Sequence, residues 1–145
     1  MKRALLTSLA VLVLLLAGGL LTASGDGGDA TGPSGISIFG TYTLQTIDGT
    51  SLPFVVIQVG NDKIEITAGS VRINSDNPYS VSLTARVTEA GTVTTETKTI
   101  TGTFSTTGSD IQFSDQGDGN GPFTGSISGN TLTIIEDGDS LVFGM

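Results

Sequence analysis

Residues 79–88 of the chain read YSVSLTARVT, and apolar and polar side chains alternate along them without a break. Tyr79, Val81, Leu83, Ala85 and Val87 share one face of such a segment. Successive side chains of a β-strand point to opposite sides, so one face would meet a core and the other would meet water. The stretch therefore predicts an antiparallel strand that is buried on one side only.

The same period-two pattern, less regular, recurs along the chain from residue 36 onward. Gly, Asn and Asp separate most of the segments, and these residues tolerate the positive φ angles of tight hairpins. Short links pair neighbouring strands, so we expect an up-and-down antiparallel meander. Closure into a small barrel of eight to ten strands would remove the two open edges of such a sheet. The further expected strands are 38–47, 53–59, 62–67, 70–74, 92–105, 110–114, 122–128, 131–136 and 140–144.

One segment conflicts with a single straight strand. Between residues 92 and 104, the apolar side chains of Ile100 and Phe104 share their parity with the charged Glu96 and Lys98. We therefore predict a bulge or bend near residues 98–101, where the inward-facing parity switches. Gly102 would make such a bend easy.

The N-terminus has the features of an export signal. Lys2 and Arg3 precede an apolar run over residues 4–21, and Thr22 and Ser24 supply small residues for cleavage. The run is also close to the length that spans a bilayer, so an uncleaved N-terminal membrane anchor is the alternative. The chain then divides into a signal peptide or anchor at 1–24, a flexible Gly- and Asp-rich linker at 25–35 and a β-barrel domain at 36–145. The expected location is secreted, periplasmic or in the cell envelope, either free or anchored by residues 4–21.

Composition excludes several classes of function. The 145 residues include no Cys and no His, which removes thiolate chemistry, the Ser-His triad and the usual zinc ligands. Without Lys2 and Arg3, the chain has four basic and fourteen acidic residues, which gives a net charge of −10. Such a charge argues against nucleic-acid binding. We expect no catalytic residues, no cofactor and no enzyme activity.

A metal site has one weak candidate. Asp115, Asp118 and Asn120 place hard oxygen atoms close together in a Gly-rich loop, as calcium sites do. The spacing is not that of an EF-hand, and a plain hairpin loop explains the same residues better. No metal site is therefore expected.

Residues 39–53, FGTYTLQTIDGTSLP, resemble the opening of small bacterial lipocalin-like domains, which are calycin-like β-barrels mostly of unknown function. The shared pattern is a Gly-x-Tyr-x-Leu strand, a two-residue turn and a Leu-Pro pair at the next strand. Further matches lie at residues 68–74, 102–113 and 125–134, so the resemblance extends over about residues 38–145. It implies a lipocalin-like barrel, open at one end, for a small apolar ligand or a lipid.

Two functions follow from the inward-facing apolar residues. They would line a cavity for a small apolar ligand or lipid, or they would fill the core of an envelope module that acts structurally or binds another protein. Contact with a membrane is expected only through an uncleaved N-terminal segment. The candidates for lining a ligand cavity are Tyr42, Leu44, Tyr79, Val81, Leu83, Phe104, Phe113, Phe123 and Phe143.

Overall fold

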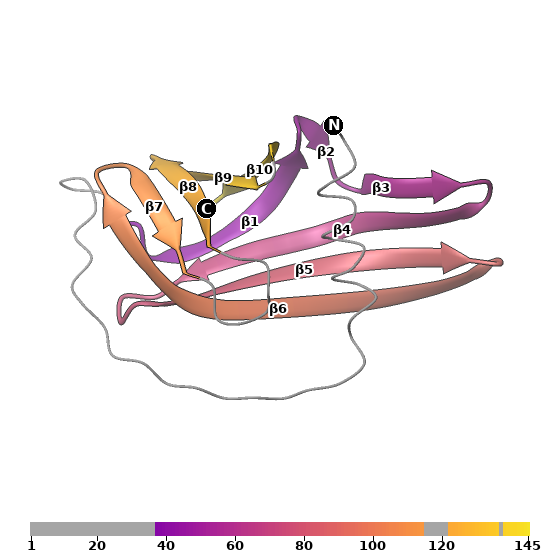
Figure 1. Cartoon of the computed structure of the whole chain (residues 1–145), viewed down its shortest axis with the longest axis horizontal. Coiled ribbons are helices and arrows are strands. Elements are labelled where there is room, and N and C mark those ends of the chain that lie inside the picture. The colour runs from indigo at the N-terminus through magenta and orange to yellow at the C-terminus, as the bar shows by residue number, and fades with distance from the viewer. Residues whose placement is uncertain (1–36, 115–121, 137) are drawn as a thin grey trace.

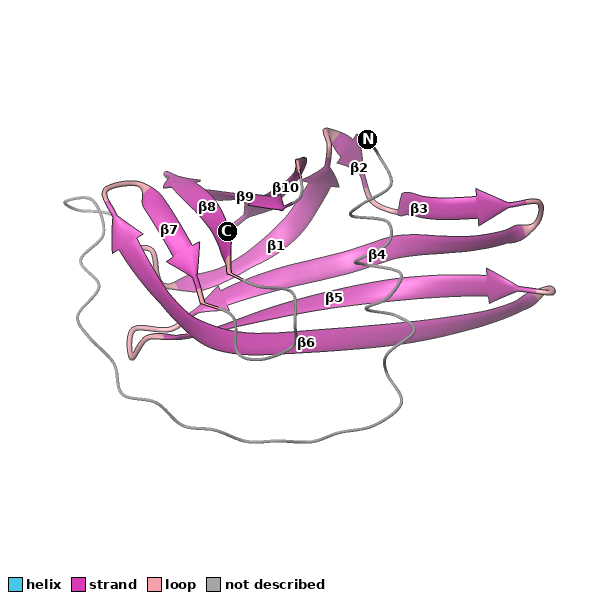
Figure 2. Ribbon diagram, in the orientation of Figure 1, coloured by secondary structure: helices cyan, strands magenta, loops and turns pink. Residues whose placement is uncertain are grey.

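The computed structural model describes residues 37–114, 122–136 and 138–145, which form ten strands (Figure 1). The expected signal helix and linker lie outside the described residues, as does the loop with Asp115, Asp118 and Asn120. The described residues include no helix able to span a membrane (Figure 2). The strands are β1 (Gly40–Ile47), β2 (Thr50–Ser51), β3 (Phe54–Val59), β4 (Asp62–Ile73), β5 (Pro78–Glu89), β6 (Thr92–Thr107), β7 (Asp110–Phe113), β8 (Phe123–Ser128), β9 (Thr131–Glu136) and β10 (Asp139–Gly144).

Eight of these strands close into an antiparallel barrel, which confirms the predicted fold class. β4 to β10 follow one another in the sheet, and β1 pairs with both β10 and β4. The closing contact is short: Gly40–Thr43 of β1 lie opposite Ser70–Ile73 of β4. β2 and β3 lie outside this ring, and each pairs with one barrel strand.

The three strands β4, β5 and β6 are too long for the barrel. They contain 12, 12 and 16 residues, whereas β7 to β10 contain four to six. Their excess halves run out beyond the barrel and pair with one another, with β3 added alongside β4 (Figure 1). We call this four-stranded sheet the extension: it comprises residues 54–59, 62–68, 83–89 and 92–98.

The predicted change of parity in the segment 92–104 is wrong. β5 and β6 pair in one uninterrupted register from Pro78–Thr103 to Glu89–Thr92, so no bulge interrupts β6. Glu96 and Lys98 lie opposite Ala85 and Leu83, on the side of the sheet that faces the core. Both residues stay partly exposed, because that half of β6 belongs to the extension, where the face is not enclosed by a barrel.

The parity changes occur in three other strands. Register shifts lie between Leu44 and Thr46 in β1 and between Ile66 and Ala68 in β4, and another lies in β3. Each bulge inserts one unpaired residue and turns the following side chains to the other face. In β4 the bulge joins two segments that the sequence pattern had separated.

The core combines large side chains with a glycine that lies close to two of them. Residues from every barrel strand bury their apolar side chains in a single cluster. Gly69 of β4 leaves room for two leucine side chains, because a Cβ atom would lie 2.8 Å from Leu83 Cδ2 and 2.9 Å from Leu44 Cδ2. A side chain at this position would force both leucines to shift.

Truncation of Phe143 tests how far the barrel depends on this core. Phe143 has no exposed surface and lies between Leu44 of β1 and Leu132 of β9 in the sheet. We expect Phe143→Ala to lower the free energy of unfolding by about 3–5 kcal/mol in urea titrations, since it removes a fully buried ring. Ile135→Ala, at a 49 % exposed position of β9, is the control and should cost less than about 1 kcal/mol. Equal losses in both variants would contradict a filled barrel.

Candidate functional site

The predicted cavity-lining residues lie together in the barrel, and seven of the nine are buried. Tyr42, Phe113 and Phe143 have no exposed surface. A side chain without exposed surface adjoins neither solvent nor a cavity large enough for a water molecule. Leu44, Tyr79, Val81 and Phe104 keep at most 8 % of their surface exposed. The part of the barrel around these side chains is therefore packed.

Both tyrosines satisfy their hydroxyl groups within the protein. The Tyr42 hydroxyl donates to the carbonyl oxygen of Ile38 at 2.9 Å, and the Tyr79 hydroxyl donates to that of Ser114 at 2.8 Å. Burial raises the pKa of Tyr42. These bonds fix the two rings as parts of the core.

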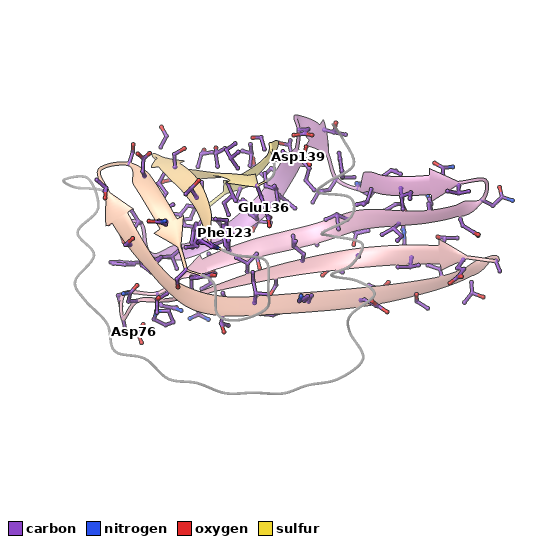
Figure 3. All side chains as sticks on the ribbon, in the orientation of Figure 1. Asp76, Phe123, Glu136 and Asp139 are labelled. Atoms are coloured by element: carbon purple, nitrogen blue, oxygen red, sulfur yellow. The ribbon has the colours of Figure 1, made fainter. Side chains whose placement is uncertain are left out.

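Phe123 differs from its neighbours because it is only half-buried. It comes from the start of β8 (Figure 3) and lies opposite Phe113 of β7 in the sheet. Its ring stacks on Phe113 at a centroid distance of 4.6 Å and meets Tyr79 edge-on at 5.8 Å. Phe123 therefore extends the buried aromatic cluster to a partly exposed position on the barrel.

Leu83 is the second predicted lining residue that is half-buried. It lies in β5 where the barrel passes into the extension, and it packs against the core with Ile64 and Ile100. Each of these residues is partly exposed and packs against the buried core. The ligand-lining role of the nine residues stays a prediction.

A groove on the outside of the barrel has a different character. It has a volume of about 460 Å³ and lies over β6, β7 and β8. Its lining side chains are mainly hydroxyl, amide and carboxylate groups, among them Ser105, Gln112 and Thr124. It contains none of the predicted ligand-lining residues, and its polar walls do not suit an apolar ligand.

The extension carries most of the exposed large apolar side chains of the described residues. Val55, Ile57 and Val59 of β3 are 44 %, 47 % and 71 % exposed, and Val93 of β6 is 58 % exposed. Outside the extension, this group includes only Ile135 and Met145. The three on β3 lie along one edge strand, whereas Val93 lies at the opposite edge of the extension. Clusters of exposed apolar residues, such as those of β3, mark interaction surfaces more often than isolated ones do.

A small ion cluster lies on the outer face of the extension, the face turned away from the core. Glu65 accepts hydrogen bonds from Lys63 Nζ at 2.9 Å and from Arg86 Nε and Nη2 at 2.9 and 2.7 Å. The two cationic side chains cover the carboxylate, which is 5 % exposed. Hydrogen bonds from Lys63 and then Arg86 lower the pKa of Glu65, with their positive charges acting in the same direction.

Glu65 and Glu96 do not form a pair of carboxylates that could act in acid–base chemistry. Glu65 points to the outer face with Arg86, whereas Glu96 lies in the inner row of Ile66 and Ala85. The Oε2 atom of Glu96 is buried and has no hydrogen-bond partner in the described part of the chain. Residues 37–114, 122–136 and 138–145 also contain no group of three acidic side chains able to hold a metal ion.

The sequence pattern did not lead us to predict the extension or its exposed apolar surface. Its signal was present in the unequal lengths of the alternating segments, ten residues at 79–88 but five at 110–114. A second signal was the run of four apolar residues, FVVI at residues 54–57, which a strand with one solvent face does not need.

The chain matches no family model, no curated protein and no solved structure.

The ion cluster predicts a pH dependence of stability. The pKa of Glu65 is lower in the folded protein, so the unfolded chain takes up the proton first as the pH falls. The stabilisation is fully present above the ordinary pKa of 4.5 and is lost as the pH falls through the lower pKa of the folded state.

We expect Glu65→Gln to be less stable than the wild type at pH 7, with a difference that shrinks below pH 4.5 in urea titrations. Glu89→Gln, at an exposed position of the same extension, is the matched control. A difference for Glu65→Gln that stays constant from pH 7 to pH 3 would contradict the role of the charge.

Proposed function

We propose that this protein is an exported, non-catalytic β-barrel that acts as a protein-interaction module at the cell surface or in the cell envelope. In this proposal the packed barrel is the scaffold, and the extension is the surface that meets a protein partner. The observation that carries it is the distribution of apolar side chains. Rings such as Phe113 and Phe143 are enclosed in the barrel, while Val55, Ile57, Val59 and Val93 are exposed on the extension.

The chemistry of the side chains supports a role without catalysis. The sequence has neither His nor Cys to activate a nucleophile. Glu65 is neutralised by two cations, and Glu96 lies on the other face of the sheet, so they do not provide an acid–base pair.

Export is supported by the order of charged and apolar residues at the N-terminus. Lys2, Arg3 and the run at 4–21 are typical of a secretory signal, and a charge of −10 after its removal would keep the domain soluble. If Ser24 is the last residue of the signal, the mass of the protein isolated from its cells should correspond to a chain that begins at Gly25. A mass that includes residues 4–21, in the membrane fraction, would indicate the anchored form instead.

The barrel also supports membership in the small bacterial lipocalin-like domains that residues 39–53 resemble. Eight antiparallel strands with consecutive neighbours from β4 to β10 suit a calycin-like barrel. What each such barrel binds would depend on the site that it carries, so the fold alone does not assign a function.

Site-specific photo-crosslinking in the producing cells tests the interaction surface. A photoreactive phenylalanine analogue replaces Ile57 on the extension or Ile135 on the outside of the barrel, two isoleucines that are 47 % and 49 % exposed. We expect protein adducts from position 57 and few from position 135, because only the former lies on the proposed surface. Adducts from neither position, or equally from both, would contradict the proposal.

A small apolar ligand is the second candidate function, and one observation favours it. Phe123 is half-buried and stacks on Phe113 at the margin of the aromatic cluster, where a hydrophobic molecule would have access. Mass spectrometry of gently purified protein should then find a retained ligand, and Phe123→Ser should weaken binding of an apolar dye at least several-fold. Protein that retains nothing and binds no dye would contradict this candidate.

A further inference from the structure

The open edge of β3 is the least protected part of the extension. β3 is the last strand of the sheet and pairs only with β4 among the described residues, so its other side presents unpaired backbone N–H and C=O groups. Such an edge is a template for another strand, and proteins usually protect it with charged side chains. β3 reads FVVIQV and carries no charge.

The other open edge of the extension is protected. Among the described residues, the first half of β6 pairs with β5 alone, because β7 pairs only with residues 104–107 of β6. This edge carries Glu96 and Lys98, whose side chains point to the inner face, and inward-pointing charges disfavour the addition of a strand. The difference between the edges singles out β3.

Bulges often disrupt an edge, but the bulge in β3 makes the strand symmetric. Phe54, Ile57 and Val59 face inward with their partners on β4, and Val55 and Gln58 face outward. Val56, the extra residue of the bulge, belongs to the buried core and therefore faces inward. The six positions thus read in, out, in, in, out, in, which is the same in both directions.

This symmetry is what pairing with an identical strand requires. Two copies of an edge strand that join one continuous sheet are related by a two-fold axis perpendicular to that sheet, so paired residues must face the same side. In the register that uses all six residues, Phe54 pairs with Val59, Val55 with Gln58 and Val56 with Ile57 of the copy. A regular strand of six residues alternates throughout, and every pair in this register would then be mismatched.

The distribution of charge allows two copies to meet at this edge. The extension has three basic and four acidic residues, while the rest of the described chain has one basic and five acidic residues. In the proposed register, the row through Val55 and Gln58 of the copy places Glu65 of one chain in line with Lys63 of the other. The approach along β3 therefore brings the weakly charged parts of two acidic molecules together.

We propose that two copies of this chain associate through β3, in antiparallel register, to form a continuous eight-stranded sheet from their two extensions. This inference rests on the proposed function and names the partner of the interaction surface. The contact is short, about 20 Å for six residues, and smaller than a standard interface of about 1,600 Å². The dimer should therefore be reversible and depend on concentration.

Sedimentation velocity of the protein purified from its producing cells tests the dimer, over concentrations from about 1 µM to about 1 mM. We expect the wild type to shift from monomer to dimer within this range. Ile57→Lys should raise the dissociation constant at least about ten-fold, because the two lysines would lie roughly 6 Å apart across the axis. Val93→Lys, at the 58 % exposed position of β6, is the matched control and should change it less than about two-fold.

A mixture of two variants distinguishes the loss of dimer pairing from a folding defect in a single variant. Ile57→Glu alone should also dissociate, whereas equal amounts of Ile57→Lys and Ile57→Glu should form a mixed dimer, because opposite charges then meet across the axis. A wild type that stays monomeric, an equal effect of Ile57→Lys and Val93→Lys, or a mixture that does not associate would each overturn the proposal. If position 57 is crosslinked to another protein in cells while the purified chain stays monomeric, the interaction module stands and the dimer does not.

Discussion

The structure depends on an inequality of strand length. The barrel closes where four residues of β1 meet four residues of β4, and β7 meets β6 only at its last residues, Phe104 to Thr107. β4, β5 and β6 continue well beyond these contacts. Since backbone polar groups need partners, the excess halves must pair with each other, and the extension follows from that need. The described residues consequently form a closed barrel without sheet edges and an open extension with two edge strands, β3 and β6.

The two parts use their side chains differently. In the barrel, inward positions are large and apolar, and two tyrosine hydroxyls are satisfied by backbone carbonyls. In the extension, the inner row that contains Ile66 and Ala85 also contains Glu96, which would be costly inside a closed barrel. The outer face holds Glu65 between Lys63 and Arg86. These charged residues thus lie in the extension, and Glu96 lies on β6, one of its two edge strands.

The sequence was sufficient for the fold class but not for the shape. Alternation at residues 79–88 and turn residues such as Asp48-Gly49 and Gly129-Asn130 are local signals, and each marked a strand or hairpin that the structure contains. The parity of Glu96 and Lys98 was misjudged, because the prediction assumed that every strand lies in the barrel along its whole length. Which half of a long strand is enclosed depends on the distant strands β1 and β7, and no local pattern reports that. The bulge in β3 was equally invisible, because FVVIQV has no alternation that a shift could interrupt.

Residue-resolved amide hydrogen exchange of the dilute, monomeric protein examines the division into barrel and extension most directly. Tyr42 and Val71 should be strongly protected at the closing contact, and residues 83–89 of β5 should be protected because strands flank them on both sides. Alternate amides of β3 should exchange rapidly, because they point to an unpaired edge. Rapid exchange throughout residues 83–89 would show that the extension is not formed, and rapid exchange at Tyr42 and Val71 would show that the barrel is not closed.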